Sequence, residues 1–209
     1  MRVIAIGCEY SGVSTLADNL MAWGRERGIN FHGDDHFSIP DRYHLDPEAQ
    51  RAMVDMLPVL KERFQRFQVV YHIRLLHHYD HIMLGGFHIE EEIYGPIYYY
   101  PGISVHATRE YEIDMPGDTL LVHLQARPEV IEARMEATPH DFQIIDKGDI
   151  PMLLERFQQE YAASLIKNKF EIDTSDLQPA DLLSAFLEKS FPYLSERDML
   201  LRLNEKLGN

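Results

Sequence analysis

The chain has 209 residues, of which 45% are hydrophobic and 26% charged, and its net charge is −14. These proportions are typical of one soluble globular domain with a substantial core. The acidity argues against a protein that follows the phosphate backbone of a nucleic acid. No apolar run is long enough for a membrane span or a signal segment, and the single cysteine, Cys8, fits a reducing compartment. We therefore expect a cytoplasmic protein with neither nucleic acid nor membrane among its partners.

The N-terminal segment has the order strand, glycine-bounded loop, helix. An apolar run over residues 2–6 precedes Gly7-Cys8-Glu9-Tyr10-Ser11-Gly12-Val13-Ser14-Thr15, and a helical pattern follows as far as Trp23. This is the context of a phosphate-binding loop, in which backbone N–H groups and a helix N-terminus point at one anion. The spacing matches G-x-x-x-x-G-K-[ST], except that Val13 stands where the lysine is usual. The alternative is a tight turn without a ligand. The residues expected to bind phosphate are Gly7, Ser11, Gly12, Val13, Ser14 and Thr15, with the Ser14 hydroxyl also placed for Mg²⁺.

Two carboxylates follow the next predicted strand, residues 29–33. In open α/β sheets, ligands bind outside the carboxyl ends of the strands. Asp34 or Asp35 is therefore placed to accept a proton from a substrate hydroxyl, or to hold Mg²⁺ through water. A turn capped by one of these side chains is an equally good explanation.

A long helical region is predicted from Asp46-Pro47 to about residue 79, with Pro58 dividing it. An apolar stripe at spacings of four and three is predicted to face the core, and its next steps reach Arg74 and His78. A buried arginine needs a carboxylate or an anionic ligand as partner. Gln68 lies beside the stripe and can offer its amide to a nucleobase. The stripe consists of Met53, Leu57, Leu60, Phe64, Phe67 and Tyr71.

Three further strands are predicted over residues 81–84, 119–124 and 169–172, with helices between and after them. Strands alternating with helices in this way predict an α/β fold of three αβα layers around a five-stranded parallel sheet. Three acids after the third strand, residues 90–92, are explained either by a solvated first helical turn or by a metal or base group. Residues 96–118 fit no single pattern. A final helix over residues 193–207 packs either on a second subunit, as in a homodimer, or on its own domain.

With these segments placed, residues 2–190 resemble the thymidylate-kinase-like branch of the P-loop nucleoside and nucleotide kinases. The most specific segment is Phe87-His88-Ile89-Glu90-Glu91-Glu92-Ile93-Tyr94-Gly95-Pro96, which is similar to the family's D-R-F-H-L-S-E-x-V-Y-G-P. The other similar segments are the loop at 7–15, Tyr71-His72-Ile73-Arg74-Leu75, Val122-His123-Leu124-Gln125-Ala126-Arg127-Pro128 with Arg134, and Ile172-Asp173-Thr174-Ser175. The departures are Val13 for the loop lysine, Gly85-Gly86 for the D-R pair, and a lid without a second arginine.

The resemblance implies P-loop NTPase topology, with a kinase-like domain over residues 1–190, a lid at about 134–149, and residues 191–209 as a C-terminal extension. It implies ATP and Mg²⁺ as cofactors and a nucleoside or nucleoside monophosphate as phosphoryl acceptor. Losing one charge-stabilising group typically costs a factor of about 10²–10³ in rate. The alternatives are therefore a nucleotide-binding protein with little turnover, or a kinase for a small non-nucleotide metabolite. The residues implied are Asp34, Asp35, Glu91 and Arg134 for catalysis, Ser14 and Asp35 for the metal, and Gln68, Arg74 and Tyr94 for the acceptor.

Overall fold

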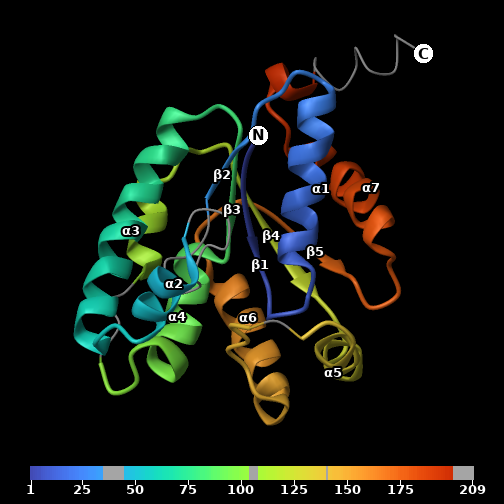
Figure 1. Cartoon of the computed structure of the whole chain (residues 1–209). Helices are drawn as coiled ribbons and strands as arrows, with labels where there is room; N and C mark the ends of the chain where they lie inside the picture. The colour runs from blue at the N-terminus through green and yellow to red at the C-terminus, as the bar shows by residue number, and fades with distance from the viewer. Residues whose placement is uncertain (35–44, 104–107, 140, 200–209) are drawn as a thin grey trace.

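The computed structural model describes residues 1–34, 45–103, 108–139 and 141–199. Five strands form one sheet in the order β2-β3-β1-β4-β5, and every neighbouring pair is parallel (Figure 1). This confirms the predicted sheet. The strands are β1 (Arg2–Ile6), β2 (His32–Asp34), β3 (Ile82–Gly85), β4 (Thr119–Gln125) and β5 (Asn168–Asp173).

The second strand begins at His32 rather than at residue 29. Ile29 and Phe31 are buried in the core ahead of the strand, and backbone pairing with the neighbouring chain segment starts only where His32 N donates to His81 O at 3.0 Å. The prediction of a strand over residues 29–33 was therefore wrong in its bounds, because burial alone does not distinguish a strand from an extended approach to it. As a result, Asp34 is the last residue of the strand.

The helices cover both faces of the sheet, and this confirms the three αβα layers. Figure 1 shows α1 and α7 on one face, with α3, α4 and α6 on the other. Along β1, Val3 and Ala5 belong to the core cluster beneath α1 and α7, whereas Ile4 and Ile6 belong to the opposite cluster, as the alternation of a strand requires. The helices are α1 (Val13–Glu26), α2 (Pro47–Val54), α3 (Pro58–His78), α4 (Phe87–Tyr94), α5 (Pro128–Ala137), α6 (Ile150–Ala163) and α7 (Pro179–Ser190).

The region that the sequence left unassigned contains two short helices among its described residues, Gly95–Tyr99 and Thr108–Asp114. The predicted break in the long helical region is confirmed, because α3 begins at Pro58 with Leu57 as its N-cap. Within the part of the chain that the structure describes, no helix is both long and apolar enough to cross a membrane.

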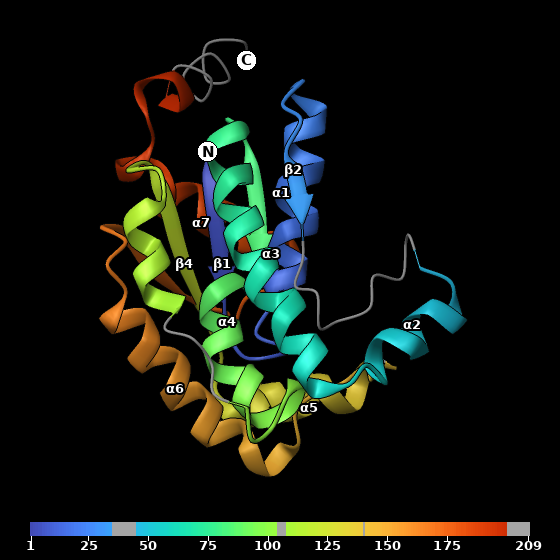
Figure 2. The same cartoon turned by 90° about the vertical axis from the view of Figure 1, so that its left-hand side faces the viewer.

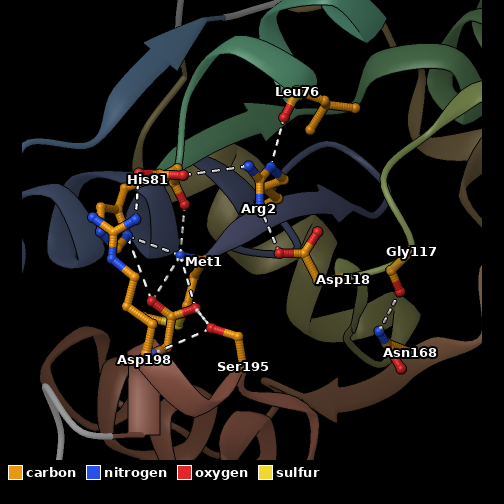
Figure 3. A network of polar contacts seen from close by, with 11 residues as sticks. Met1, Arg2, Leu76, His81, Gly117, Asp118, Asn168, Ser195 and Asp198 are labelled. Carbon is orange, nitrogen blue, oxygen red and sulfur yellow. Dashed lines mark hydrogen bonds and ion pairs between the residues drawn. The ribbon is translucent and has the colours of Figure 1, made fainter.

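A polar network joins the amino ends of the strands (Figure 3). The Met1 amine donates to Asp80 O at 2.9 Å and to Asp198 Oδ1 at 3.2 Å. Arg2 Nε donates to Leu76 O at 2.6 Å, which fixes the C-terminal end of α3 beside the start of β1. Leu194 is buried in the core beneath α7. Leu194 is also extended, with ψ 140°, so the predicted start of the final helix at residue 193 was wrong. The described residues there pack on their own domain, and residues 200–207 lie outside the described part.

The face that α3 turns to the core is the opposite of the predicted one. Phe64 is 50% exposed and Phe67 72% exposed, so the prediction of a core-facing stripe through these residues was wrong. A second row of residues at the same helical spacing faces inward instead, and packing against α4 and the sheet decided between the two. Arg74 is exposed with the first row. The buried residues of α3 are Lys61, Glu62, Gln65, Val69, His72, Ile73, Leu75 and Leu76.

The solvated first helical turn that was one explanation for the acids at residues 90–92 is wrong for Glu90 and Glu91. Both are buried, with 8% and 3% of their surface exposed, so a solvated first turn does not describe them. Their helix, α4, lies between α3 and α6 against the sheet (Figure 2). Covered on these sides, it has little surface left to turn to solvent.

Candidate functional site

The loop between β1 and α1 ends in a conformation that glycine adopts readily. Gly12 has φ +108° and is the N-cap of α1, and no side chain caps this end. The first N–H groups of any helix lack an intrahelical acceptor. At the start of α1 these donors and the positive end of the helix dipole therefore remain available to an anion.

The loop is held to its neighbours through its backbone. Ser11 N donates to Cys8 O at 2.9 Å, and Glu9 N donates to the Tyr94 hydroxyl oxygen at 3.0 Å. Thr174, which follows β5, donates its hydroxyl to Ser11 O at 2.8 Å. Burial raises the pKa of the Cys8 thiol to about 12, so this cysteine is a neutral packing residue near pH 7. Tyr94 thus contacts the loop itself.

Arg134 reaches the same loop from α5. Its Nη1 donates to Tyr10 O at 2.9 Å and to Thr174 Oγ1 at 3.1 Å, and its Nη2 donates to Thr174 O at 2.6 Å. Burial lowers the pKa of this guanidinium, and the charge of Asp173 opposes the shift. The arginine places its positive charge beside the loop while it joins the loop to the turn after β5.

The residues that open α1 differ in where they point. Val13 is half-buried against the apolar cluster under α1 and α7, whereas Ser14 is exposed and Thr15 half-buried. Among the described residues, no group of three or more His, Cys, Asp or Glu side chains could hold a metal. Mg²⁺ beside a nucleotide takes few protein ligands and relies on phosphate oxygens and water. The exposed Ser14 hydroxyl fits that need.

The segment after α5, within the predicted lid, contacts the loop between β1 and α1 directly. Glu9 Oε2 accepts hydrogen bonds from Ile144 N at 3.0 Å and Ile145 N at 3.1 Å. Tyr10 donates its hydroxyl to Gln143 Oε1 at 3.0 Å. Two consecutive residues of the loop therefore hold the predicted lid segment over it.

Asp34 stands at the carboxyl end of β2, next to a buried histidine of α3. His72 is 3% exposed, and its Nε2 lies 3.2 Å from Asp34 Oδ2. The ring packs edge-on against Phe87, with centroids 5.3 Å apart. The carboxylate of Asp34 thus lies within ion-pair distance of a buried imidazole whose Nε2 makes no hydrogen bond, at the sheet edge where ligands bind in open α/β folds. Asp35 lies outside the described residues.

Gly86 follows the carboxyl end of β3, and the carboxylate of Glu90 lies against it. Gly86 has φ +68° and is the N-cap of α4, and a Cβ on it would lie 2.1 Å from Glu90 Oε2. Glu90 Oε1 accepts a hydrogen bond from the Tyr99 hydroxyl at 3.2 Å. The side chain of Glu90 therefore folds over the position where the resembling family carries an arginine.

One of the predicted acceptor residues, Arg74, lies apart from this group. Arg74 is exposed on the outside of α3, within one turn of Leu76, which contacts the start of β1 at the opposite end of the sheet. Gln68 is half-buried. Sequence reasoning missed the buried His72 and Gln65. The signal for them was a second stripe on α3 at the same spacing as the apolar one, with polar residues at several of its positions.

Comparison with solved structures finds clear similarity in fold. The chain is similar to the YorR protein from Bacillus subtilis, solved in complex with phosphorylated GDP, with a TM-score of 0.59, 15% identity, and coverage of 93% of this chain and 99% of that one. It is also similar to deoxyadenosine kinase from M. mycoides, solved with bound dATP, with a TM-score of 0.58, 12% identity, and coverage of 90% and 98%. No family model matches the sequence, and no curated protein matches it. The chain has the fold of the P-loop kinases.

Proposed function

We propose that this protein is an ATP-dependent phosphotransferase acting on a nucleoside or a nucleoside monophosphate. The observation that carries the proposal is the uncapped start of α1, reached through Gly12 and flanked by the guanidinium of Arg134. Backbone amides, a helix N-terminus and one cation converge there, and this is the combination that holds a polyphosphate. Within the P-loop kinases, the segment at 87–96 favours the thymidylate-kinase-like branch.

The donor nucleotide would occupy the loop. The first-turn amides of α1 would bind the phosphates, and Ser14 would contact Mg²⁺, which neutralises charge on the phosphoryl group being transferred. Arg134 would add positive charge at the edge of the loop. The lid segment held by Glu9 and Tyr10 would exclude water from the donor side.

The acceptor would lie at the carboxyl end of β2, beside Asp34. Asp34 would accept the proton of the attacking hydroxyl, and His72 would hold that carboxylate in place. Gln65 and Gln68 on α3 would offer their amides to the edge of a base. The buried Glu91 on α4 is a second carboxylate for this side.

A nucleotide-binding protein with little turnover is the second candidate, and two residues favour it. Val13, half-buried against the apolar cluster under α1 and α7, stands where the resembling kinases have a lysine that would reach the phosphates. Gly86 leaves no room for a side chain beside Glu90. The groups that stabilise the transition state in the resembling kinases are therefore replaced at both places, while the backbone cradle remains.

Parallel binding and turnover measurements test the proposal. Calorimetry with ATP and Mg²⁺ measures binding, and a coupled ADP-release assay over deoxynucleosides, ribonucleosides and their monophosphates measures turnover. The proposal predicts ATP binding together with phosphorylation of at least one acceptor. Asp34→Asn should lower kcat by a factor of about 100 or more, and it should leave ATP affinity unchanged. Asp18→Asn, an exposed acid in the second turn of α1, is the matched control.

The outcomes separate the two candidates. ATP binding without any phosphorylated product would support the binding protein and overturn the enzyme. Equal turnover in wild type and Asp34→Asn would overturn the assignment of the base. Absence of ATP binding would overturn both candidates, because both depend on the phosphate-binding loop.

A further inference from the structure

The predicted lid turns two successive backbone N–H groups toward the loop between β1 and α1. Ile144 N and Ile145 N donate to the same carboxylate oxygen, Glu9 Oε2, at 3.0 Å and 3.1 Å. We call these two donors the lid amides. Successive backbone N–H groups that point at one oxygen can bind other anions in the same way. The lid therefore carries a site for an anion, and the carboxylate of Glu9 fills it.

The lid amides are fixed by packing on one side and by hydrogen bonds on the other. Ile145 is 1% exposed and belongs to the core cluster shared by α3, α4 and α6, and Ile144 packs against that cluster. Gln143 Nε2 donates to Ile145 O at 3.1 Å, and Gln143 Oε1 accepts from the Tyr10 hydroxyl at 3.0 Å. Tyr10 would thus keep the lid beside the loop even if the carboxylate of Glu9 moved away.

A carboxylate in a loop that binds phosphates needs an explanation. Glu9 stands two residues after Gly7 within the loop, and a negative charge there repels a polyphosphate bound at the start of α1. The chain as a whole carries a net charge of −14, so a further acid at this place adds to a field that already opposes an anionic ligand. This conflict is smaller if the carboxylate gives up the lid amides when a phosphate arrives.

The side chains of the lid leave few other donors for a phosphoryl group. Among the described residues of the lid, 134–139 and 141–149, the cations are Arg134 and Lys147. Arg134 already donates from both Nη1 and Nη2, to Tyr10 O and to Thr174. Lys147 is exposed and pairs with Glu136. A lid of this composition has to contact phosphate mainly through its backbone.

We propose that the lid amides bind a phosphate of the donor nucleotide, and that Glu9 holds their place until the nucleotide displaces it. The inference rests on the proposed function, because it assigns further donors to the same site. The N–H groups of Ile144 and Ile145 would pass from a carboxylate oxygen to a phosphate oxygen, while Tyr10 keeps Gln143 in place. The backbone would then supply hydrogen-bond donors at the phosphoryl group, where the resembling kinases have the second arginine of the lid.

Calorimetry with a non-hydrolysable ATP analogue and Mg²⁺ measures the competition. Glu9→Gln keeps the shape of the side chain but makes its contact with the lid amides a neutral one, which is about half as strong as a charged one. This variant should therefore bind the analogue about five- to tenfold more tightly than the wild type. Glu136→Gln removes an exposed acid of the same lid and is the matched control, with unchanged affinity. Circular dichroism shows that each variant folds.

Hydrogen exchange of residues 143–146 follows the lid amides themselves, without any turnover. Before ligand is added, Glu9→Ala should speed their exchange by about tenfold or more, because the acceptor of both N–H groups is gone. Inorganic triphosphate with Mg²⁺ should slow the exchange again in this variant, and adenosine should not. In Glu136→Gln the exchange should match that of the wild type under each condition.

The results distinguish the inference from the proposed function. If Glu9→Gln binds the analogue no more tightly than the wild type does, the carboxylate does not hold the place of a phosphate, and the inference alone is overturned. It is also overturned if triphosphate leaves the exchange of the lid amides in Glu9→Ala unchanged although calorimetry shows that the analogue binds. Absence of binding in the wild type and in both Glu9 variants would overturn the proposed function, and the inference with it.

Discussion

Arg134 and Thr174 are joined by two hydrogen bonds, from Nη1 to the threonine hydroxyl at 3.1 Å and from Nη2 to its carbonyl oxygen at 2.6 Å. Thr174 in turn donates to Ser11 O, so hydrogen bonds join α5, the turn after β5 and the loop between β1 and α1. Arg134, which the sequence predicted to act in catalysis, thus stabilises the packing of these three segments.

Replacement of this arginine should destabilise the chain before any ligand is added. Arg134→Met removes the guanidinium donors, and we expect the free energy of unfolding to fall by about 1–3 kcal/mol. Chemical denaturation measures it. Arg127→Met, which removes an ion pair with the exposed Asp176, should cost clearly less. Equal losses in the two variants would contradict the structural role.

Glu112 should make stability depend on pH in acid. Burial by itself would raise the pKa of this carboxyl, but hydrogen bonds from His88, Leu165 N and Ser164 outweigh burial and lower it from 4.5. The carboxylate therefore stabilises the fold above about pH 4.5, and this contribution is lost as the pH falls through the lower folded value. Glu112→Gln should lower the free energy of unfolding by about 2 kcal/mol or more near pH 7.

The difference in unfolding free energy between wild type and Glu112→Gln should shrink as the pH falls below about 4.5. Denaturation curves measured between neutral and acid pH show whether it does. Glu110→Gln, an exposed acid in the same short helix, should have little effect at any pH. A difference that stayed constant down to the lowest pH would show that the charge of Glu112 is not what stabilises the fold.

Gly86 and Glu90 should be energetically coupled. A Cβ at Gly86 meets the Glu90 carboxylate and also strains the backbone at φ +68°, so Gly86→Ala should cost about 2–3 kcal/mol of unfolding free energy. Glu90→Ala should recover part of the loss, with an interaction of at least about 0.5 kcal/mol in a double-mutant cycle. Gly102→Ala, at φ +83° with open space around it, measures backbone strain alone. A cost no larger than that control would contradict the steric argument.

A lysine at position 13 should strengthen nucleotide binding. Val13 is only half-buried, so a longer side chain can follow the surface and extend its charge toward the loop. A charge-assisted hydrogen bond is worth about 1.5–3 kcal/mol, so Val13→Lys should bind ATP about tenfold more tightly or better. Calorimetry measures the affinity, with Val13→Met as the uncharged control. Similar affinities for the two variants would argue against phosphate beside this position.

Local patterns in the sequence determined most of the fold. The apolar runs of β1, β3, β4 and β5, the glycine-bounded loop after β1 and the break at Pro58 are each set by residues close in the chain. The physical constraints are local as well: an apolar strand, a backbone angle that favours glycine, and a missing N–H. The order of the strands was implied only by the resemblance to the P-loop kinases, because parallel strands joined by helices still have several arrangements open to them.

Tertiary packing decided the rest. Two stripes on α3 have the same helical spacing. The more apolar one was predicted to face the core and is exposed, whereas the inward stripe carries several polar residues, among them His72 beside Asp34. Glu90 is buried because α4 lies between α3 and α6, which no local pattern records. Periodicity tells which residues share a face of a helix, but what that face meets depends on contacts between segments that are far apart in the chain.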